Sequence, residues 1–215
     1  MDARTRKLGK YSIFLDWSSE MIAAIQAGGK STRMGRDKAW VELDELPLIL
    51  HCVRAVSPLV SDINIIVSRD TPDLERYQEV CQENGLKLLM DKYLHHGPLG
   101  GISTALDLDT DDGKVLVLAC DLPFVSSAFL SFLLNRHVDT EITAPSDESG
   151  KLQMLCAIYN VSCRTIVDKM IREGVYKVQE LRSRAKLIEV RFEEYAHLEG
   201  APGFLRNINS PTDLV

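Results

Sequence analysis

The sequence predicts an α/β protein, a three-layer sandwich whose mostly parallel central sheet carries helices on both faces. Two observations predict this fold class. From Met21 onward, short apolar runs alternate with helical segments long enough to serve as right-handed crossovers between parallel strands. The composition, with 45% apolar and 26% charged residues in a chain of 215, suits a protein with a sizeable buried core.

The first expected strand is the apolar run 21–27, which leads into the glycine pair Gly28–Gly29. A helix is predicted over 48–56. The next strand, 63–67, is rich in β-branched residues and ends in a polar loop.

A helix is expected over 71–84, because a proline lies in its first turn and Gly85 follows its last residue. Strand 86–90 comes next. Gly97 then leads into a helix predicted over 98–108.

The run 114–120 is the most apolar strand and ends at Asp121. A helix with a serine N-cap is predicted over 126–137. The C-terminal third is less regular: we expect strands at 141–144, 152–159 and 187–192, and a helix at 161–173 with one apolar face.

The first twenty residues differ from the rest of the chain. Residues 1–10 hold four basic side chains and one acidic one, and the apolar patch that follows is short and interrupted by Asp16. We therefore expect 1–20 to be a poorly ordered N-terminal extension and 21–215 to form a single domain.

Composition excludes several function classes. The net charge of −6 argues against binding of long nucleic acid, and no stretch approaches the roughly 20 apolar residues that span a membrane. The five cysteines are scattered and never spaced Cys-x-x-Cys, so a zinc or redox site is not expected. Free thiols of this kind suit a reducing cytoplasm.

Ligands of parallel sheets bind beyond the carboxyl ends of the strands, so the loop after the first strand is a candidate ligand site. Adjacent glycines there can present amide donors to phosphate, and Arg33 and Lys38 add positive charge. The loop is not a P-loop, because Ala24 occupies a required glycine position, and no Gly-x-Gly-x-x-Gly occurs. A plain turn with solvated charges is the alternative, but the combination with Gly35 favours phosphate binding.

Two aspartates follow later strands. Asp121 is either a turn or capping residue or a metal ligand, and the sequence alone favours neither. Asp91 either caps a loop or accepts hydrogen bonds from a nucleoside. The adjacent histidines His95 and His96 fit a solvated loop or a second substrate better than a metal.

The segment Ala27-Gly-Gly-x-x-x-Arg-Met-Gly-x-Asp-Lys38 resembles the signature of molybdenum cofactor guanylyltransferases, the MobA family of the nucleotidyltransferase superfamily. Other segments agree in order and spacing over about residues 21–215. They are Leu43 to Leu48, Gly97-Pro-Leu-Gly-Gly101, Cys120-Asp-Leu-Pro123 and Asn207-Ile-Asn-Ser-Pro211.

The resemblance implies a Rossmann-like nucleotidyltransferase fold and a reaction. The terminal phosphate of molybdopterin would attack the α-phosphorus of GTP with Mg²⁺ as cofactor, transferring GMP and releasing pyrophosphate. Lys38 would contact the α-phosphate, Arg33 would hold the leaving phosphates and Asp121 would bind Mg²⁺. The remaining implied nucleotide contacts are Gln26, Ala27, Gly28, Gly29 and Asp91. Those implied for the second substrate are Gln153, Asn207 and Asn209.

Three positions depart from the family pattern. Gln26 stands where the family has an apolar residue, Ser68 where some members have an asparagine, and Met154 where a proline is frequent. A cytidylyl- or sugar-phosphate nucleotidyltransferase therefore stays an alternative, as does a non-catalytic nucleotide-binding relative. Beyond GTP and molybdopterin, the resemblance implies transient contact with other proteins of the cofactor pathway, and neither nucleic acid nor membrane as a partner.

Overall fold

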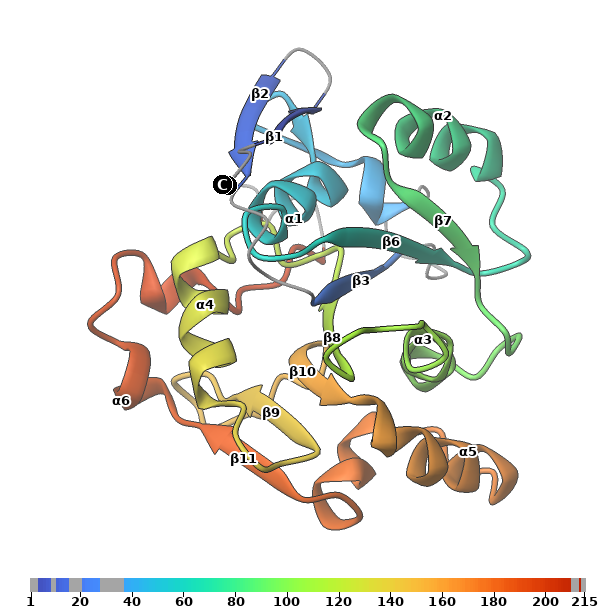
Figure 1. The fold of residues 1–215 in the computed structure, drawn as a ribbon, viewed down its shortest axis with the longest axis vertical. Helices are drawn as coiled ribbons and strands as arrows, with labels where there is room; N and C mark the ends of the chain where they lie inside the picture. Colours follow the sequence, from blue (N-terminus) through green and yellow to red (C-terminus); the bar gives the residue numbers. More distant parts are fainter. Residues whose placement is uncertain (1–3, 9–10, 16–20, 28–36, 210–212, 214–215) are drawn as a thin grey trace.

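A computed structural model describes residues 4–8, 11–15, 21–27, 37–209 and 213 of the chain (Figure 1). Its centre is a seven-stranded sheet. Only β10 runs antiparallel to its neighbours β8 and β9, and the other described strand pairs of this sheet are parallel. In sheet order the strands are β11 (Leu187–Val190), β9 (Ile142–Pro145), β10 (Cys156–Asn160), β8 (Lys114–Ala119), β3 (Ile22–Gln26), β6 (Asp62–Val67) and β7 (Lys87–Met90).

Helices cover both faces of the sheet, which confirms the predicted three-layer sandwich (Figure 1). One core lies beneath α1 (Leu48–Val56), α2 (Leu74–Asn84), α4 (Ser127–Arg136) and the short α6 (Phe192–Tyr195). The other lies beneath α3 (Pro98–Ala105) and α5 (Arg164–Arg172).

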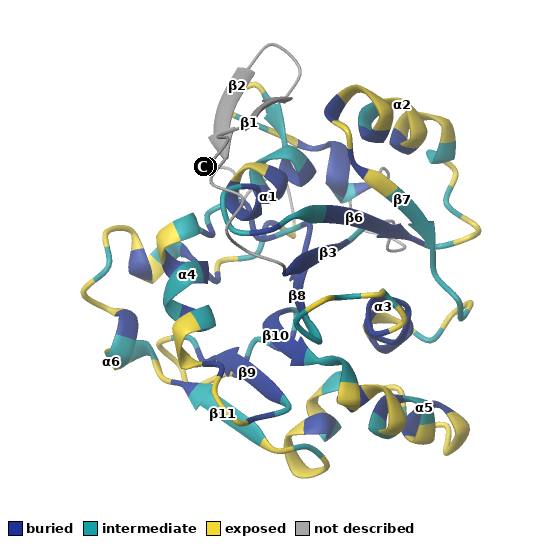
Figure 2. Cartoon of the chain, in the orientation of Figure 1, coloured by how far each residue is buried: buried dark blue, intermediate teal, exposed yellow. Residues whose placement is uncertain are grey.

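Strand β3 shows why this sheet is apolar on both faces. Ala23 and Ile25 belong to the core under α1, whereas Ala24 belongs to the core under α3. All three are fully buried, and the centre of Figure 2 is correspondingly dark. A parallel strand between two helical layers has no solvent face, so the continuous apolar run of the sequence is what this position requires.

Helix ends follow the expected local signals. Gly85 adopts a left-handed conformation with φ of 63° at the end of α2. Ser126 caps α4, because its Oγ accepts a hydrogen bond from the backbone N–H of Phe129 at 3.2 Å. Gly97 precedes α3 with φ of 60°, and Pro98 occupies its first turn.

Short elements complete the description. These are the two-residue strands β4 (Glu42–Leu43) and β5 (Leu46–Pro47), and the 3₁₀ turns η1 (Lys38–Trp40), η2 (Val161–Cys163), η3 (Val178–Ser183) and η4 (Ala201–Gly203).

The expected strand 152–159 is wrong at its start. Leu152 forms only an isolated bridge to Ser146, and β10 begins at Cys156. The three residues between them instead border the cavity described below. An apolar run alone does not distinguish a strand from a buried loop that leads into one.

Before the domain, β1 (Arg4–Leu8) and β2 (Tyr11–Leu15) pair as an antiparallel hairpin that is separate from the central sheet. The division into an extension, 1–20, and a domain, 21–215, stays a prediction. No described helix is long and apolar enough to cross a membrane.

All five cysteines are free and buried, as expected of small core residues. Burial raises the pKa of the Cys81 thiol to about 11 and of Cys156 and Cys163 to about 12. These thiols are therefore held in the unreactive protonated form at neutral pH.

Candidate active site

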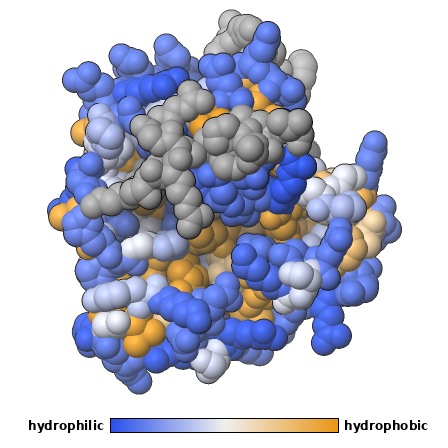
Figure 3. Space-filling model, turned by 180° about the vertical axis from the view of Figure 1, so that it is seen from behind, coloured by the Kyte–Doolittle hydropathy of each residue, from blue (hydrophilic) through white to orange (hydrophobic). Residues whose placement is uncertain are grey.

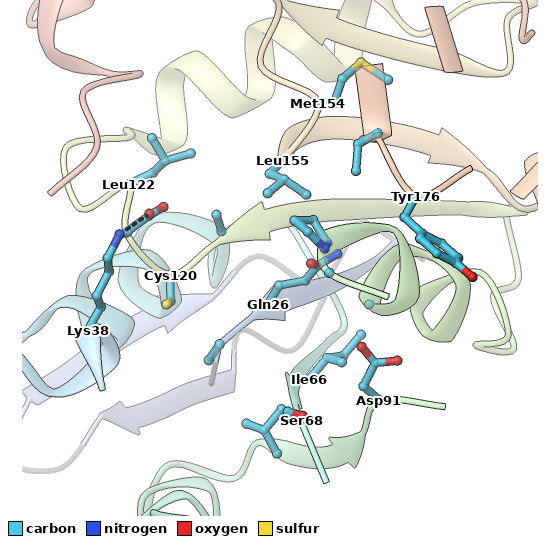
Figure 4. A pocket seen from close by; sticks show the side chains of 18 of the residues that line it. Gln26, Lys38, Ile66, Ser68, Asp91, Cys120, Leu122, Met154, Leu155 and Tyr176 are labelled. Carbon is cyan, nitrogen blue, oxygen red and sulfur yellow. Dashed lines mark hydrogen bonds and ion pairs between the residues drawn. The ribbon is translucent and has the colours of Figure 1, made fainter. Parts of the chain in front are cut away.

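A cavity of about 810 Å³ opens at the edge of the sheet where the parallel strands end (Figure 4). Segments that follow β3, β6, β7 and β8 form its walls, together with the segment that enters β10. Because β10 is antiparallel, its first residues lie at the same edge as the last residues of its neighbours. Seen from behind, the molecule shows apolar surface between hydrophilic lobes (Figure 3).

Lys38 and Asp121 lie at one end of the cavity, which we call the phosphate end. Lys38 Nζ is 3.4 Å from Asp121 Oδ2 and donates a hydrogen bond to Asn209 Oδ1 at 2.5 Å. The backbone N–H of Ile208 donates to the carbonyl of Asp121 at 3.0 Å, which brings the C-terminal segment to this place. Three segments far apart in the sequence therefore fix the position of one ammonium group.

Asp37 holds the turn that carries Lys38. Its Oδ1 accepts the backbone N–H of Ala39 at 3.1 Å, and its Oδ2 accepts the hydroxyl of Tyr77 at 2.7 Å. The Tyr77 ring packs on Trp40, 4.6 Å between centroids, so α2 clamps η1 from the side. Burial raises the pKa of Asp37, and the bonds from Tyr77 and Ala39 act in the opposite direction.

Asp121 has an unused acceptor. Its Oδ1 is buried and takes no hydrogen bond from the described residues, although a buried carboxylate oxygen without a partner is costly. Among the described residues, no group of three or more His, Cys, Asp or Glu side chains is placed so that it could hold a metal ion. One carboxylate with a free oxygen fits Mg²⁺, which takes one or two protein carboxylates plus phosphate oxygens and water.

Asp91 marks the opposite end, which we call the base end. Its Oδ1 accepts the backbone N–H of Tyr93 at 2.9 Å and the hydroxyl of Thr104 at 3.2 Å. Its Oδ2 takes part in neither bond. A Cβ on Gly100 would lie 2.9 Å from that oxygen, so glycine is needed for the close approach of α3. Burial raises the pKa of Asp91, while these hydrogen bonds lower it.

Gln26 ties the end of β3 to α3. With its amide oriented so that both atoms are satisfied, Nε2 donates to the carbonyl of Pro98 at 3.2 Å and Oε1 accepts the N–H of Ile102 at 3.0 Å. A Cβ on Gly101 would lie only 2.6 Å from Gln26 Cδ. The polar residue that departs from the family pattern is thus bonded to the glycine-rich turn rather than aimed freely at a ligand.

The structure brings most of the sequence-predicted site residues together. Those that line the cavity are Gln26, Ala27, Lys38, Asp91, Asp121, Gln153 and Asn207. Asn209, expected on the second-substrate side, bonds to Lys38. Gly28, Gly29 and Arg33 lie outside the described residues. Which of these residues touch substrate stays a prediction.

Two other cavity residues received no role from the sequence. The signature contains Asp37 but implies no role for it, and its hydrogen-bond partner Tyr77 lies 40 positions away in the sequence. Tyr176, which follows α5, lines the cavity although it belongs to no motif. Neither position carries a local signal that could have revealed its function. Ser68 also lines the cavity, and its hydroxyl donates to the neighbouring carboxylate of Asp70.

The fold and the site define a class of protein. A mostly parallel sheet with a cavity at the carboxyl ends of its strands is an α/β protein that binds its ligand at that edge of the sheet. The chain belongs to the MobA-like NTP transferase family, whose domain profile matches residues 23–188, and it is a nucleotidyltransferase. This confirms the resemblance seen in the sequence.

Individual relatives agree. The chain is 40% identical over 192 residues to a probable molybdenum cofactor guanylyltransferase of Clostridium perfringens strain 13, covering 87% of this chain and 91% of the relative. A Pyrococcus horikoshii protein of the same description is 30% identical, with coverage of 91% and 97%. Among solved structures, molybdopterin-guanine dinucleotide biosynthesis protein A of Archaeoglobus fulgidus matches with a TM-score of 0.74 at 23% identity, covering 90% and 95%. The last likeness shows a shared fold.

Proposed function

We propose that this nucleotidyltransferase transfers GMP from GTP to the terminal phosphate of molybdopterin, with or without its molybdenum, to form molybdopterin guanine dinucleotide. The observation that carries the proposal is that a single cavity holds a cation beside a carboxylate at one end and a second carboxylate at the other. The descriptions of the relatives support the choice of guanine and molybdopterin.

The reaction asks for charge stabilisation and positioning. An oxygen of the molybdopterin phosphate forms a bond to the α-phosphorus of GTP, the α–β bridging P–O bond breaks, and its electron pair leaves with pyrophosphate. Lys38 is suited to the α-phosphate, because Asn209 and Asp121 hold its ammonium group in place. Arg33, from the preceding loop, is proposed for the β- and γ-phosphates.

Asp121 is the residue proposed to hold Mg²⁺, through the Oδ1 atom that has no partner among the described residues. The bound ion supplies positive charge that offsets the charge of the phosphates. Asp121 thus has two tasks at separate oxygens: Oδ2 faces Lys38, and Oδ1 is left for the metal.

Asp91 is proposed to select the base. Guanine presents two neighbouring donors, N1–H and N2–H, which a carboxylate can accept together. Adenine and cytosine place an acceptor where guanine has N1–H, so each would set two acceptors against each other. We place the backbone amides of Gly28 and Gly29, together with Ala27 and Gln26, in contact with the nucleotide on the side away from Asp91.

Gln153 and Asn207 are proposed for the second substrate. Gln153 lies at the start of the segment leading into β10, and its Nε2 donates to Asp147 at 3.2 Å. Placement in the cytoplasm, and transient contact with proteins that supply or receive the cofactor, are further parts of the proposal. The five free, buried thiols are compatible with a reducing compartment.

The test uses two measurements. In a thermal shift assay with Mg²⁺, GTP should raise the melting temperature more than equal concentrations of CTP or ATP. With GTP and molybdopterin, pyrophosphate release should match formation of the guanine dinucleotide, as resolved by chromatography. A larger shift with CTP and a cytosine dinucleotide product would move the protein to the cytidylyltransferases. Binding without product in either case would identify a non-catalytic relative.

A further inference from the structure

Three aromatic rings join two loops at the base end of the cavity. His96 and Tyr93 come from the loop between β7 and α3, and Tyr176 follows α5. The His96 ring meets Tyr176 edge-on, with 4.5 Å between centroids and 74° between planes. It also lies 5.3 Å from the Tyr93 ring. We call Tyr93, His96 and Tyr176 the aromatic wall.

Within the wall, Tyr176 is exposed, whereas Tyr93 and His96 are half-buried. Among the described residues, the markedly exposed large hydrophobic side chains are Leu94 and Tyr176, each 44% exposed, and Val138 at 63%. Leu94 belongs to the same loop as His96, and Tyr176 lines the cavity. Exposed aromatic surface beside a concave site is typical of a contact that a ligand covers.

The wall lies beside Asp91. The backbone N–H of Tyr93 donates to Asp91 Oδ1, and the positive charge that His96 can carry acts to lower the Asp91 pKa. Figure 4 shows Tyr176 and Asp91 toward one end of the cavity and Lys38 toward the other. A planar ligand whose edge meets Asp91 would therefore present its face to the wall.

We propose that Tyr176, held edge-on by His96, stacks on the purine ring of the bound nucleotide while Asp91 accepts the hydrogen bonds of its edge. This inference rests on the proposed function, because it assigns the ring to GTP. In this arrangement the Tyr176 ring and the Asp91 carboxylate have different tasks. Stacking strengthens binding of any base, since every base has a π-face, whereas the carboxylate discriminates among bases.

The nucleotide is favoured over the second substrate as the occupant. The wall shares the loop that carries Asp91 and lies away from Lys38, where the α-phosphate belongs. The acceptor must deliver its phosphate to Lys38, and Asn207, proposed to contact the acceptor, directly precedes Ile208, whose N–H donates to the carbonyl of Asp121 beside Lys38. In this arrangement the nucleotide lies with its phosphates at Lys38 and its base between Asp91 and Tyr176, and all three residues border one cavity.

The experiment measures dissociation constants of GTP, ATP and inorganic triphosphate with Mg²⁺, by calorimetry, for three variants. Tyr176→Ala should weaken GTP and ATP by the same factor, about 5- to 100-fold as expected for loss of one base stack, and leave triphosphate binding unchanged. Tyr176→Phe keeps a stacking ring and should retain most of the affinity. Val138→Ala shortens an exposed side chain that does not line the cavity and serves as the matched control.

Three results would contradict the proposal that Tyr176 stacks on the purine ring. Unchanged GTP affinity in Tyr176→Ala would do so, and so would an equal loss of triphosphate binding, which would indicate a structural defect. Unchanged GTP affinity with a raised KM for molybdopterin would assign the wall to the second substrate. Failure of the proposed function looks different: the wild-type protein itself would then bind GTP no better than triphosphate.

Discussion

The two ends of the cavity are built in different ways. At the phosphate end, Lys38, Asp121 and Asn209 come from three distant parts of the sequence and meet through direct contacts of 2.5 and 3.4 Å. At the base end, Asp91 follows β7 directly and its partner Thr104 lies in α3, the next element of the chain. One end is assembled by the fold as a whole, and the other is largely a property of one loop and one helix.

This difference in construction predicts that turnover and base preference can be changed separately. In the proposed function, the charges at the phosphate end act on groups that all nucleoside triphosphates share, so a change there should alter turnover without altering base preference. The base end is fixed by its own internal hydrogen bonds, so a change there should alter preference first. Five substitutions and one change of pH test this separation and the contacts behind it, in order of decreasing expected effect.

Lys38→Ala removes the cation at the phosphate end. Turnover should fall on the order of 10²–10³-fold, the usual loss when one charge-stabilising donor is removed, while the ratio of GTP to ATP affinity stays unchanged. Steady-state pyrophosphate release and nucleotide titrations measure the two quantities. Lys87→Ala is the control, because Lys87 is 60% exposed and pairs with Asp62 on the surface. A loss of base preference in Lys38→Ala would break the comparison.

Asp121→Asn keeps the shape of the side chain but removes the charge proposed to hold Mg²⁺. The apparent Mg²⁺ affinity should fall by more than the roughly 10–100-fold that loss of an outer-shell partner costs. Pyrophosphate release is measured against Mg²⁺ concentration, with circular dichroism to show that the fold is retained. An unchanged Mg²⁺ dependence would exclude Asp121 as the metal ligand.

Asp91→Asn replaces one acceptor oxygen with a donor. The preference for GTP over ATP should fall by a factor that corresponds to about 1–3 kcal/mol, the cost of an unsatisfied buried polar group. Competition binding measures the preference. Turnover at saturating GTP should change less than in Lys38→Ala. Equal losses for GTP and ATP would show that Asp91 supports the loop rather than the base.

The same preference should depend on pH in the wild-type protein. The folded-state pKa of Asp91 is raised by burial, so protonation begins at a higher pH than for an ordinary aspartate near 3.9. Only the ionised form accepts both guanine donors. The GTP preference should therefore be complete at neutral pH and decline as the pH falls toward the raised pKa, whereas the Asp91→Asn variant should show no such decline.

Gly101→Ala places a Cβ 2.6 Å from Gln26 Cδ and should destabilise the protein by about 1–3 kcal/mol through overpacking. Urea unfolding measures the loss. Gly203→Ala is the matched control, because its added Cβ would meet nothing closer than 4.0 Å. In a Gln26→Ala background the Gly101→Ala change should cost less, since the clashing side chain is gone. Strict additivity would show that the two residues do not touch.

Tyr77→Phe removes only the hydroxyl that donates to Asp37, at 2.7 Å, and keeps the ring on Trp40. The expected loss of stability is about 1–3 kcal/mol, with a small decrease in turnover because η1 carries Lys38. The variant should raise the folded-state pKa of Asp37 further above its unfolded value. The loss should therefore be present at neutral pH and shrink as the pH falls through that pKa. A pH-independent loss would point to packing instead.

Sequence patterns anticipated the elements that local rules control. Helix α1 lies where it was predicted, at 48–56, because apolar spacing and the strands on either side bound it. Asp91 and Asp121 were predicted to lie at the site because they come at or just beyond the ends of strands, and both line the cavity, although their contacts with substrate stay a prediction. The start of β10 was missed, because Leu152 and Met154 are buried in the core beneath α3 and α5 without belonging to a strand.

Contacts between distant segments were beyond the reach of the sequence. The hydrogen bond from Lys38 to Asn209 joins positions 171 apart, and the pairing of His96 with Tyr176 joins two loops with no shared motif. Asn209 was assigned to the second substrate by resemblance, and nothing in its neighbourhood in the chain points to Lys38. The local end of the cavity was thus the more predictable one.

The buried thiols provide a built-in reporter of how the protein opens. Cys52, Cys81, Cys120 and Cys156 lie in the core beneath α1, α2 and α4, whereas Cys163 lies in the core beneath α3 and α5. An alkylating reagent reaches such sulfurs only when the helices above them move away from the sheet. The rate at which each cysteine is modified therefore reports how often its own layer opens. If the chain opens as one unit, all five thiols should be modified at a single rate. If the two layers open independently, Cys163 should be modified at a different rate from the other four.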